Sequence, residues 1–186
     1  MNDNFPIIVS MKKYSAYNYL RNATIKHHLP AQNYYEFNCI DNGLNIVLNN
    51  KFGSSISNVK QIPQYNGDLW LIAKGFSDQT KQFPPEYQFG LFFDFNEKKG
   101  EGFLLNNLIF HNVLATFFQP KRLFLFACYQ GKYAEQYSQS IACLQEVHGI
   151  ENTADFSQLN QHLLLYFKAS HSYKMSLSFD KNQQAK

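Results

Sequence analysis

Two short motifs in the second half of the chain contain residue types that can do nucleophilic chemistry. Lys74 and Gly75 follow an apolar run that ends at Ala73. Cys128 follows a similar run that ends at Ala127. A cysteine thiolate is a strong nucleophile, and a nearby ammonium group favours the thiolate over the thiol. Cys128 is therefore the candidate nucleophile, and Lys74 is its candidate partner.

The two apolar runs predict how these residues are positioned. Continuous apolar segments such as residues 68–73 and 122–127 are typical of strands that are buried on both faces of a parallel sheet. Reactive groups of open α/β sheets gather beyond the carboxyl ends of such strands. We therefore expect Lys74 and Cys128 on neighbouring parallel strands, with Nζ and Sγ within about 8 Å of each other.

The rest of the chain supplies strands and helices for an α/β fold with a mostly parallel central sheet flanked by helices. Hydrophobic spacing, turn residues and caps predict these elements. They are a strand over 5–9, a helix over 14–25, a hairpin over 35–48, a strand over 90–95, helices over 105–117, 133–148 and 155–167, and an edge strand over 173–179.

The two motifs resemble those of caspase-like cysteine peptidases, which include bacterial caspase-like domains and the self-cleaving domains of large bacterial toxins. Those proteins carry an apolar strand that ends in His-Gly and a second strand that ends in Cys. Here the motifs are Leu-Trp-Leu-Ile-Ala-Lys-Gly, which ends at Gly75, and Leu-Phe-Leu-Phe-Ala-Cys-Tyr-Gln-Gly, which ends at Gly131. Lys74 and Cys128 are 54 positions apart, close to the caspase separation of about 50. The resemblance covers about residues 68–168.

The resemblance implies a caspase-like sandwich fold and a peptidase site. In the family, a thiolate attacks the scissile carbonyl, a histidine carries the proton to the leaving amine, and backbone N–H groups beside both residues hold the oxyanion. The implied site consists of Cys128 as nucleophile, Lys74 in the position of the base, and Gly75 and Gly131 as oxyanion and loop residues.

Lys74 departs from the pattern of the family. A lysine ammonium has an ordinary pKa near 10.4 and is a poor proton shuttle at neutral pH, so we expect the peptidase reaction to be lost. Desolvation can lower a lysine pKa to about 7 or 8, which leaves an active Cys128–Lys74 pair as an alternative. Structural roles are also open, because Cys128 can be a packed small hydrophobe and Lys74 a solvated loop charge.

The other histidines and cysteines are expected to be structural. His111 is expected to face water, because asparagines surround it on a predicted helix. His148 is expected in the last turn of a helix that ends at Gly149, where a cation favours the helix dipole. Cys39 and Cys143 are expected to be core or helix-face residues. The sequence contains no zinc-binding pattern or phosphate-binding glycine loop, and we predict neither a metal nor a cofactor.

Composition favours one domain with an aromatic core. The 186 residues contain no linker rich in Gly, Ser or Pro, so we expect a single domain over 1–186 in which residues 1–60 add a strand, a helix and a hairpin. Aromatic residues make up 17% of the chain. Part of that surplus is expected at the surface, where it would favour a protein partner or a second copy of the chain.

Charge and cysteine content exclude some classes of partner. The net charge of +3 is spread without a basic cluster, which argues against nucleic-acid binding. No apolar window is long enough to span a membrane. Three cysteines at no disulfide-like spacing favour a reducing, cytoplasmic location, and export without a signal peptide stays open.

Two functions follow from the sequence. The chain is expected to be a caspase-like protein whose catalysis is degenerate, or alternatively a non-catalytic protein-interaction module with an α/β fold. In both cases a protein or peptide partner is expected, and a peptide can dock along an exposed strand edge.

Overall fold

The structure, a computed structural model, describes ten segments of the chain, namely residues 5–11, 28–30, 33–40, 45–50, 65–76, 91–96, 101–104, 107–169, 172–175 and 177–180. Its strands are β1 (Phe5–Met11), β2 (Tyr34–Ile40), β3 (Asn45–Asn50), β4 (Tyr65–Ile72), β5 (Phe92–Asn96), β6 (Glu101–Leu104), β7 (Arg122–Phe126), β8 (Glu146–Gly149) and β9 (Leu177–Asp180). Its helices are α3 (Asn107–Val113), the π-helix η5 (Leu114–Phe118), the 3₁₀ helices η6 (Gln130–Tyr133) and η7 (Phe156–Gln158), α4 (Ala134–Ser140) and α5 (Leu159–Ala169).

A seven-stranded sheet forms the centre of the molecule, with the order β3-β2-β1-β4-β7-β8-β9. The five inner strands, from β2 to β8, are parallel, and each edge strand is antiparallel to its neighbour. The direction of chain progression across the sheet changes between β1 and β4. The predicted α/β architecture with a mostly parallel central sheet is confirmed.

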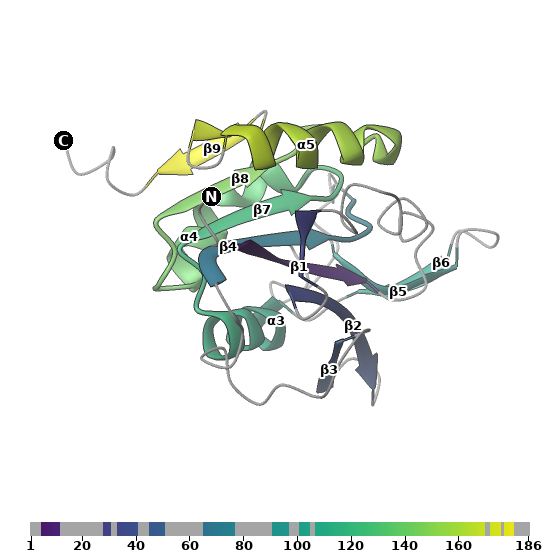
Figure 1. Ribbon diagram of the computed structural model, residues 1–186. Coiled ribbons are helices and arrows are strands. Elements are labelled where there is room, and N and C mark those ends of the chain that lie inside the picture. Colours follow the sequence, from purple (N-terminus) through teal and green to yellow (C-terminus); the bar gives the residue numbers. More distant parts are fainter. Residues whose placement is uncertain are drawn as a thin grey trace.

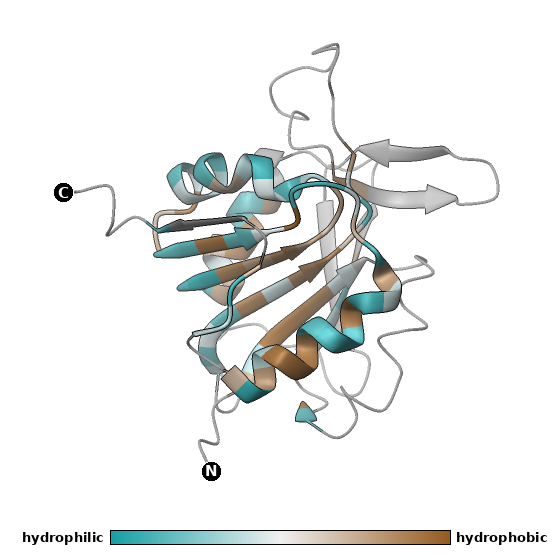
Figure 2. Ribbon diagram, turned by 90° about the horizontal axis from the view of Figure 1, so that it is seen from above, coloured by the Kyte–Doolittle hydropathy of each residue, from teal (hydrophilic) through white to brown (hydrophobic). Residues whose placement is uncertain are grey.

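Alternation of residue type along the strands gives the two faces of the sheet different compositions. The register pairs Trp70 of β4 with Phe124 of β7, and Leu71 with Leu125. Side chains point alternately to opposite faces of a strand, so the leucines lie on one face and the aromatic rings on the other. All four are completely buried. In Figure 2 the middle strands are brown along much of their length.

Helices cover both faces (Figure 1). Helix α5 packs on the aromatic face, where the ring of Tyr166 lies 5.4 Å from those of Trp70 and Phe124. On the other face, Phe110 of α3 lies 5.5 Å from Phe37 of β2. The buried helices and the two sheet faces together form one hydrophobic core.

Several predicted elements are confirmed. The hairpin has the expected antiparallel pairing of β2 and β3, although its turn lies outside the described residues. Asp155 caps the start of η7, which runs into α5, by accepting a hydrogen bond from the N–H of Ser157. Strand β9 is an edge strand, as expected, but it begins only at Leu177. The helix predicted over 14–25 lies outside the described residues.

Two predictions about helices need correction. The helix expected over 133–148 ends at Ser140, and a strand, β8, occupies residues 146–149. Tyr137, Ile141 and Leu144 are buried as their spacing suggests, but Ile141 is already extended and ends the helix. The second correction concerns the helix expected over 105–117, where α3 ends at Val113 and changes into a π-helical turn.

Strand β5 also differs in position from the expected strand. It pairs with β6 in a separate two-stranded sheet and not with the central one. A single bridge between Gly75 and Leu91 connects this region to the end of β4. The loop around Lys74 is therefore held from two sides, by the neighbouring strand β7 and by the segment that leads into β5.

Candidate functional site

The two sequence motifs meet at the carboxyl ends of neighbouring strands. Strands β4 and β7 are parallel, and their register pairs Ile72 with Phe126. The N–H of Ala73 donates to the carbonyl of Phe126 at 3.4 Å, which extends the pairing beyond the strands. The prediction that Lys74 and Cys128 follow neighbouring parallel strands is confirmed. The predicted distance between Nζ and Sγ stays a prediction.

Gly75 brings the backbones of the two motifs into direct contact. A Cβ atom at this position would lie 2.3 Å from the carbonyl oxygen of Cys128, closer than any allowed contact. The carbonyl of Lys74 is also fixed, because it accepts a hydrogen bond of 3.0 Å from the N–H of Phe92. Gly75 therefore allows the close approach of the Lys74 loop to Cys128.

Cys128 is buried, with 4% of its surface exposed. Its Sγ accepts a hydrogen bond of 3.3 Å from the backbone N–H of Ala154. Side chains of a strand alternate between the two faces of the sheet, so Cys128 lies on the same face as Phe124 and Phe126, which α5 covers. Its partner Ala154 lies just before η7 and α5, which agrees with this placement. The thiol is thus enclosed, with a main-chain N–H as a hydrogen-bond partner.

A segment that follows β8 lies along the residues after Cys128. This segment comprises residues 150–154, and we call it the covering segment. The carbonyl of Asn152 accepts a hydrogen bond of 2.7 Å from the N–H of Tyr129, and that of Ile150 accepts one of 2.9 Å from the N–H of Gly131. The N–H of Gly131 would have to leave this partner before it could bind an oxyanion.

The chain turns sharply at Tyr129, which has a left-handed backbone conformation with φ of 62°. Such a conformation costs a non-glycine residue about 1–3 kcal/mol and needs support from its surroundings. The hydrogen bond to Asn152 gives part of that support. The ring of Tyr129 also lies 5.3 Å from the ammonium group of Lys132.

Gly131 and Gly149 are in contact through their backbones. A Cβ atom at Gly149 would lie 2.6 Å from the Cα of Gly131, and one at Gly131 would lie 2.9 Å from the carbonyl oxygen of Gly149. The absence of side chains at both positions lets the end of β8 approach the turn after Cys128. For Gly131 the structure therefore shows a packing role.

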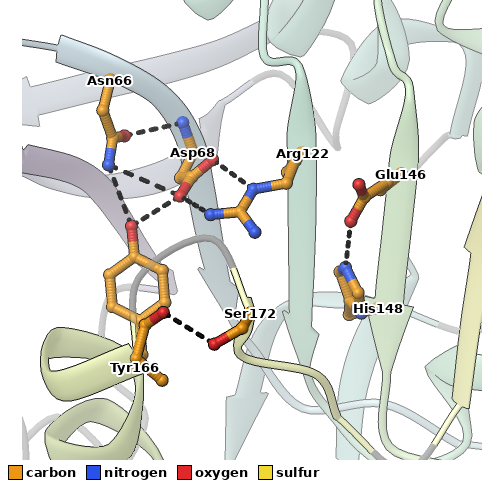
Figure 3. Close-up of polar contacts among 8 residues, drawn as sticks. Asn66, Asp68, Arg122, Glu146, His148, Tyr166 and Ser172 are labelled. Carbon is orange, nitrogen blue, oxygen red and sulfur yellow. Dashed lines mark hydrogen bonds and ion pairs between the residues drawn. The ribbon is translucent and has the colours of Figure 1, made fainter.

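A buried polar cluster occupies the opposite ends of the same two strands (Figure 3). Asp68, where β4 begins to pair with β7, forms a two-pronged ion pair with Arg122 at the start of β7. In this pair Nε donates to Oδ1 at 2.7 Å and Nη2 donates to Oδ2. The hydroxyl of Tyr166 on α5 donates to Oδ2 at 2.7 Å, and Asn66 donates to the Tyr166 oxygen at 3.0 Å. Two strands and a helix are thereby joined.

The surroundings of this cluster keep Arg122 and the Tyr166 hydroxyl protonated, so that both can donate hydrogen bonds. Burial by itself lowers the pKa of Arg122, but the hydrogen bonds and charge of Asp68 outweigh it and leave that pKa above its ordinary value. Burial and the charge of Asp68 raise the pKa of the Tyr166 hydroxyl, which therefore stays protonated. The cluster is a satisfied ion pair that supports the fold, because each charge has a partner.

The spacing of Asp68 and Arg122 in the sequence is itself a signal for this cluster. Asp68 and Arg122 are 54 positions apart, the same separation as Lys74 and Cys128. Paired residues of two parallel strands differ by a constant number of positions in the sequence. The difference that aligns Lys74 with Cys128 therefore also pairs Asp68 with Arg122. Opposite charges at the starts of two apolar strands, at that offset, predict an ion pair.

Two histidines differ from the predictions. His111, expected to face water, is only 4% exposed and its ring packs 4.9 Å from that of Tyr137; burial lowers its pKa to about 4. His148, expected at a helix end, is buried in β8 and stacks on Phe124 at 4.8 Å. Burial lowers the pKa of His148, although Nε2 lies 3.0 Å from a carboxylate oxygen of Glu146.

The other two cysteines and His162 lie on other elements than Cys128. Cys143, expected in the core or on a helix face, is exposed in the turn between α4 and β8. Cys39 lies in β2, and its side chain is outside the described part of the structure. His162 of α5 contacts the hydroxyl of Tyr173 through Nδ1 at 2.5 Å.

Within the ten described segments, no three His, Cys, Asp or Glu residues are grouped so that they could bind a metal ion. The helices found there are all too short or too polar to cross a membrane. No family model matches the chain, and no curated protein or solved structure shows significant similarity to it.

Proposed function

We propose that the chain is related to caspase-like cysteine peptidases and has lost the peptidase reaction. The observation that carries this proposal is the contact between the two motifs. Lys74 and Gly75 follow one strand, Cys128 follows its parallel neighbour, and Gly75 touches the Cys128 backbone. The resemblance requires the base and the nucleophile to be close in this way.

Three features support the loss of catalysis. A lysine replaces the histidine that would carry the proton to the leaving amine. The Cys128 thiol is buried, so a scissile carbonyl cannot reach it without a rearrangement. The N–H groups of Tyr129 and Gly131, which lie beside Cys128, already donate to carbonyls of the covering segment.

A non-catalytic interaction module is the second candidate function. The observation that favours it is the outer surface of α5, where Leu164 is 40% and Leu165 is 47% exposed. Apolar side chains exposed there would suit contact with another protein if they belong to a larger apolar surface. In this case Cys128 is a packed residue. A protein or peptide partner and a cytoplasmic location belong to both proposals, and nucleic-acid binding belongs to neither.

Restoring the missing histidine tests the first proposal. We expect no cleavage of a peptide library by the native protein, and measurable cleavage of the library or of the chain itself by Lys74→His. A positioned general acid and base contributes about 10²- to 10⁴-fold in rate, which an ordinary assay detects by mass spectrometry of the products.

The matched control is the double variant Lys74→His/Cys128→Ala, which must be silent. Cleavage by the native protein that disappears with Cys128→Ala would show that Lys74 is a working base and that catalysis is not lost. Silence of the native and the Lys74→His proteins, with both folded, would favour the interaction module.

A further inference from the structure

Three hydrogen bonds that use main-chain atoms of the covering segment attach it to the Cys128 region, and the hydroxyl of Thr153 also lies 3.4 Å from that of Tyr129. The N–H of Ala154 donates to the Cys128 sulfur. The carbonyl of Asn152 accepts from the N–H of Tyr129, and the carbonyl of Ile150 accepts from the N–H of Gly131. All three contacts involve residues 128–131. The segment therefore covers the candidate nucleophile and the two adjacent backbone donors at once.

The two ends of the covering segment pack against the core through Ile150 and Ala154, whereas the side chains of its middle residues are exposed. Before it, Gly149 touches Gly131. After it, Phe156 packs against Phe126 with ring centroids 5.4 Å apart. Between these anchors Glu151, Asn152 and Thr153 are exposed. Segments with few buried apolar contacts and exposed backbone hydrogen bonds have the lowest local stability of a fold.

We propose that the covering segment is a strap that masks Cys128 and opens locally while the sheet stays folded. Opening removes the Ala154 donor from the sulfur and frees the N–H groups of Tyr129 and Gly131 in the same step. The carbonyls of an extended peptide could then accept hydrogen bonds from these N–H groups in place of the carbonyls of the strap. The inference rests on the proposed function, because it describes how access to the Cys128 site is controlled.

Site-resolved alkylation of the full chain tests the strap. Iodoacetamide is added at neutral pH, and mass spectrometry follows the modified peptides. Exposed Cys143 serves as the internal reference that reacts first. We expect slow but measurable alkylation of Cys128 whose rate does not change with low urea, because local opening exposes little surface.

A pair of glycine variants distinguishes the strap from general destabilisation. Asn152→Gly loosens the strap and should accelerate Cys128 alkylation about two- to fivefold. Ala142→Gly changes an exposed turn residue outside the strap, and should leave that rate unchanged even if the unfolding midpoint shifts.

Three results would overturn the proposal. These are a Cys128 rate that rises with urea in parallel with global unfolding, equal acceleration by the two variants, and complete protection of Cys128 in the native state. None of these results depends on whether Lys74→His restores cleavage, so the strap and the proposed function can fail separately.

Discussion

At the scale of single residues, contact with a neighbouring backbone or core determines what a side chain can do. Gly75 has room only for hydrogen, because a larger residue would collide with the Cys128 carbonyl. His111 is an ordinary titratable residue by type, but burial beside Tyr137 keeps it neutral. In both cases the residue type is readable from the sequence, whereas its surroundings come from elements that are distant along the chain.

Burial of His111 makes folding stability depend on pH. The pKa of His111 is lowered to about 4 in the folded protein, from 6.5. The unfolded chain binds the proton more tightly, so the contribution of neutral His111 is complete above pH 6.5 and is lost as the pH falls toward 4. We expect a loss of about 2–3 kcal/mol by pH 4.5.

Urea unfolding at several pH values measures this loss, and the variant His111→Leu should show a flatter pH dependence than the native protein. His148 and His162, whose pKa values burial also lowers, contribute in the same direction in both proteins. An NMR titration midpoint of the His111 ring near 6.5 would contradict the prediction.

At the scale of elements, helix α5 is fixed to the sheet by an aromatic contact and a polar one. Tyr166 supplies both. Its ring packs on Trp70, and its hydroxyl donates to Asp68 (Figure 3). The Asp68 carboxylate that accepts this hydrogen bond is buried and also forms an ion pair with Arg122. Tyr166 therefore joins α5 to β4, beside the buried Leu159 and Leu163 of the same helix.

Removing the Tyr166 hydroxyl should weaken the fold. Hydrogen bonds to charged groups contribute about 1.5–3 kcal/mol, so Tyr166→Phe should lower the free energy of unfolding by that amount. Urea unfolding measures the effect. The matched control is Tyr129→Phe, which removes an exposed hydroxyl 3.4 Å from Thr153 and should cost less than about 0.5 kcal/mol. Equal losses in the two variants would disprove the role of the Asp68 contact.

The elements also show what the sequence could and could not predict. The runs that end at Ala73 and Ala127 identified neighbouring strands, because continuous burial on both faces leaves a clear apolar signal. Strand β8 was missed, because four residues carry too little pattern and Tyr137, Ile141 and Leu144 share a helical spacing. The position of the covering segment was not predicted, since most of its hydrogen bonds to residues 128–131 use backbone atoms, which every residue has.

At the scale of the whole molecule, the order of strands differs from their order in the chain. Strand β1, from the start of the chain, lies between β2 and β4 near the centre of the sheet. Its Ile7, Ile8 and Val9 are completely buried. A large part of the core therefore depends on pairing between segments that are far apart in sequence, which slows folding.

A fragment that ends at residue 64 tests this dependence. It contains β1, β2 and β3 but lacks β4, so one edge of β1 and much of its apolar surface have no partner. We expect the fragment to aggregate or to remain unfolded. Size-exclusion chromatography and an amide NMR spectrum measure this. A monomer with well-dispersed amide signals would show that the first three strands fold independently.

The central position of β1 also has a consequence for synthesis on the ribosome. Met11 ends β1 and Tyr65 begins β4, so 54 more residues must be added before pairing can start. At about 5–20 residues per second this takes about 3–11 s. During that time the most apolar strand of the first half can associate with other nascent chains. Slower translation of residues 12–64 would lengthen the exposure and should reduce the yield of folded protein.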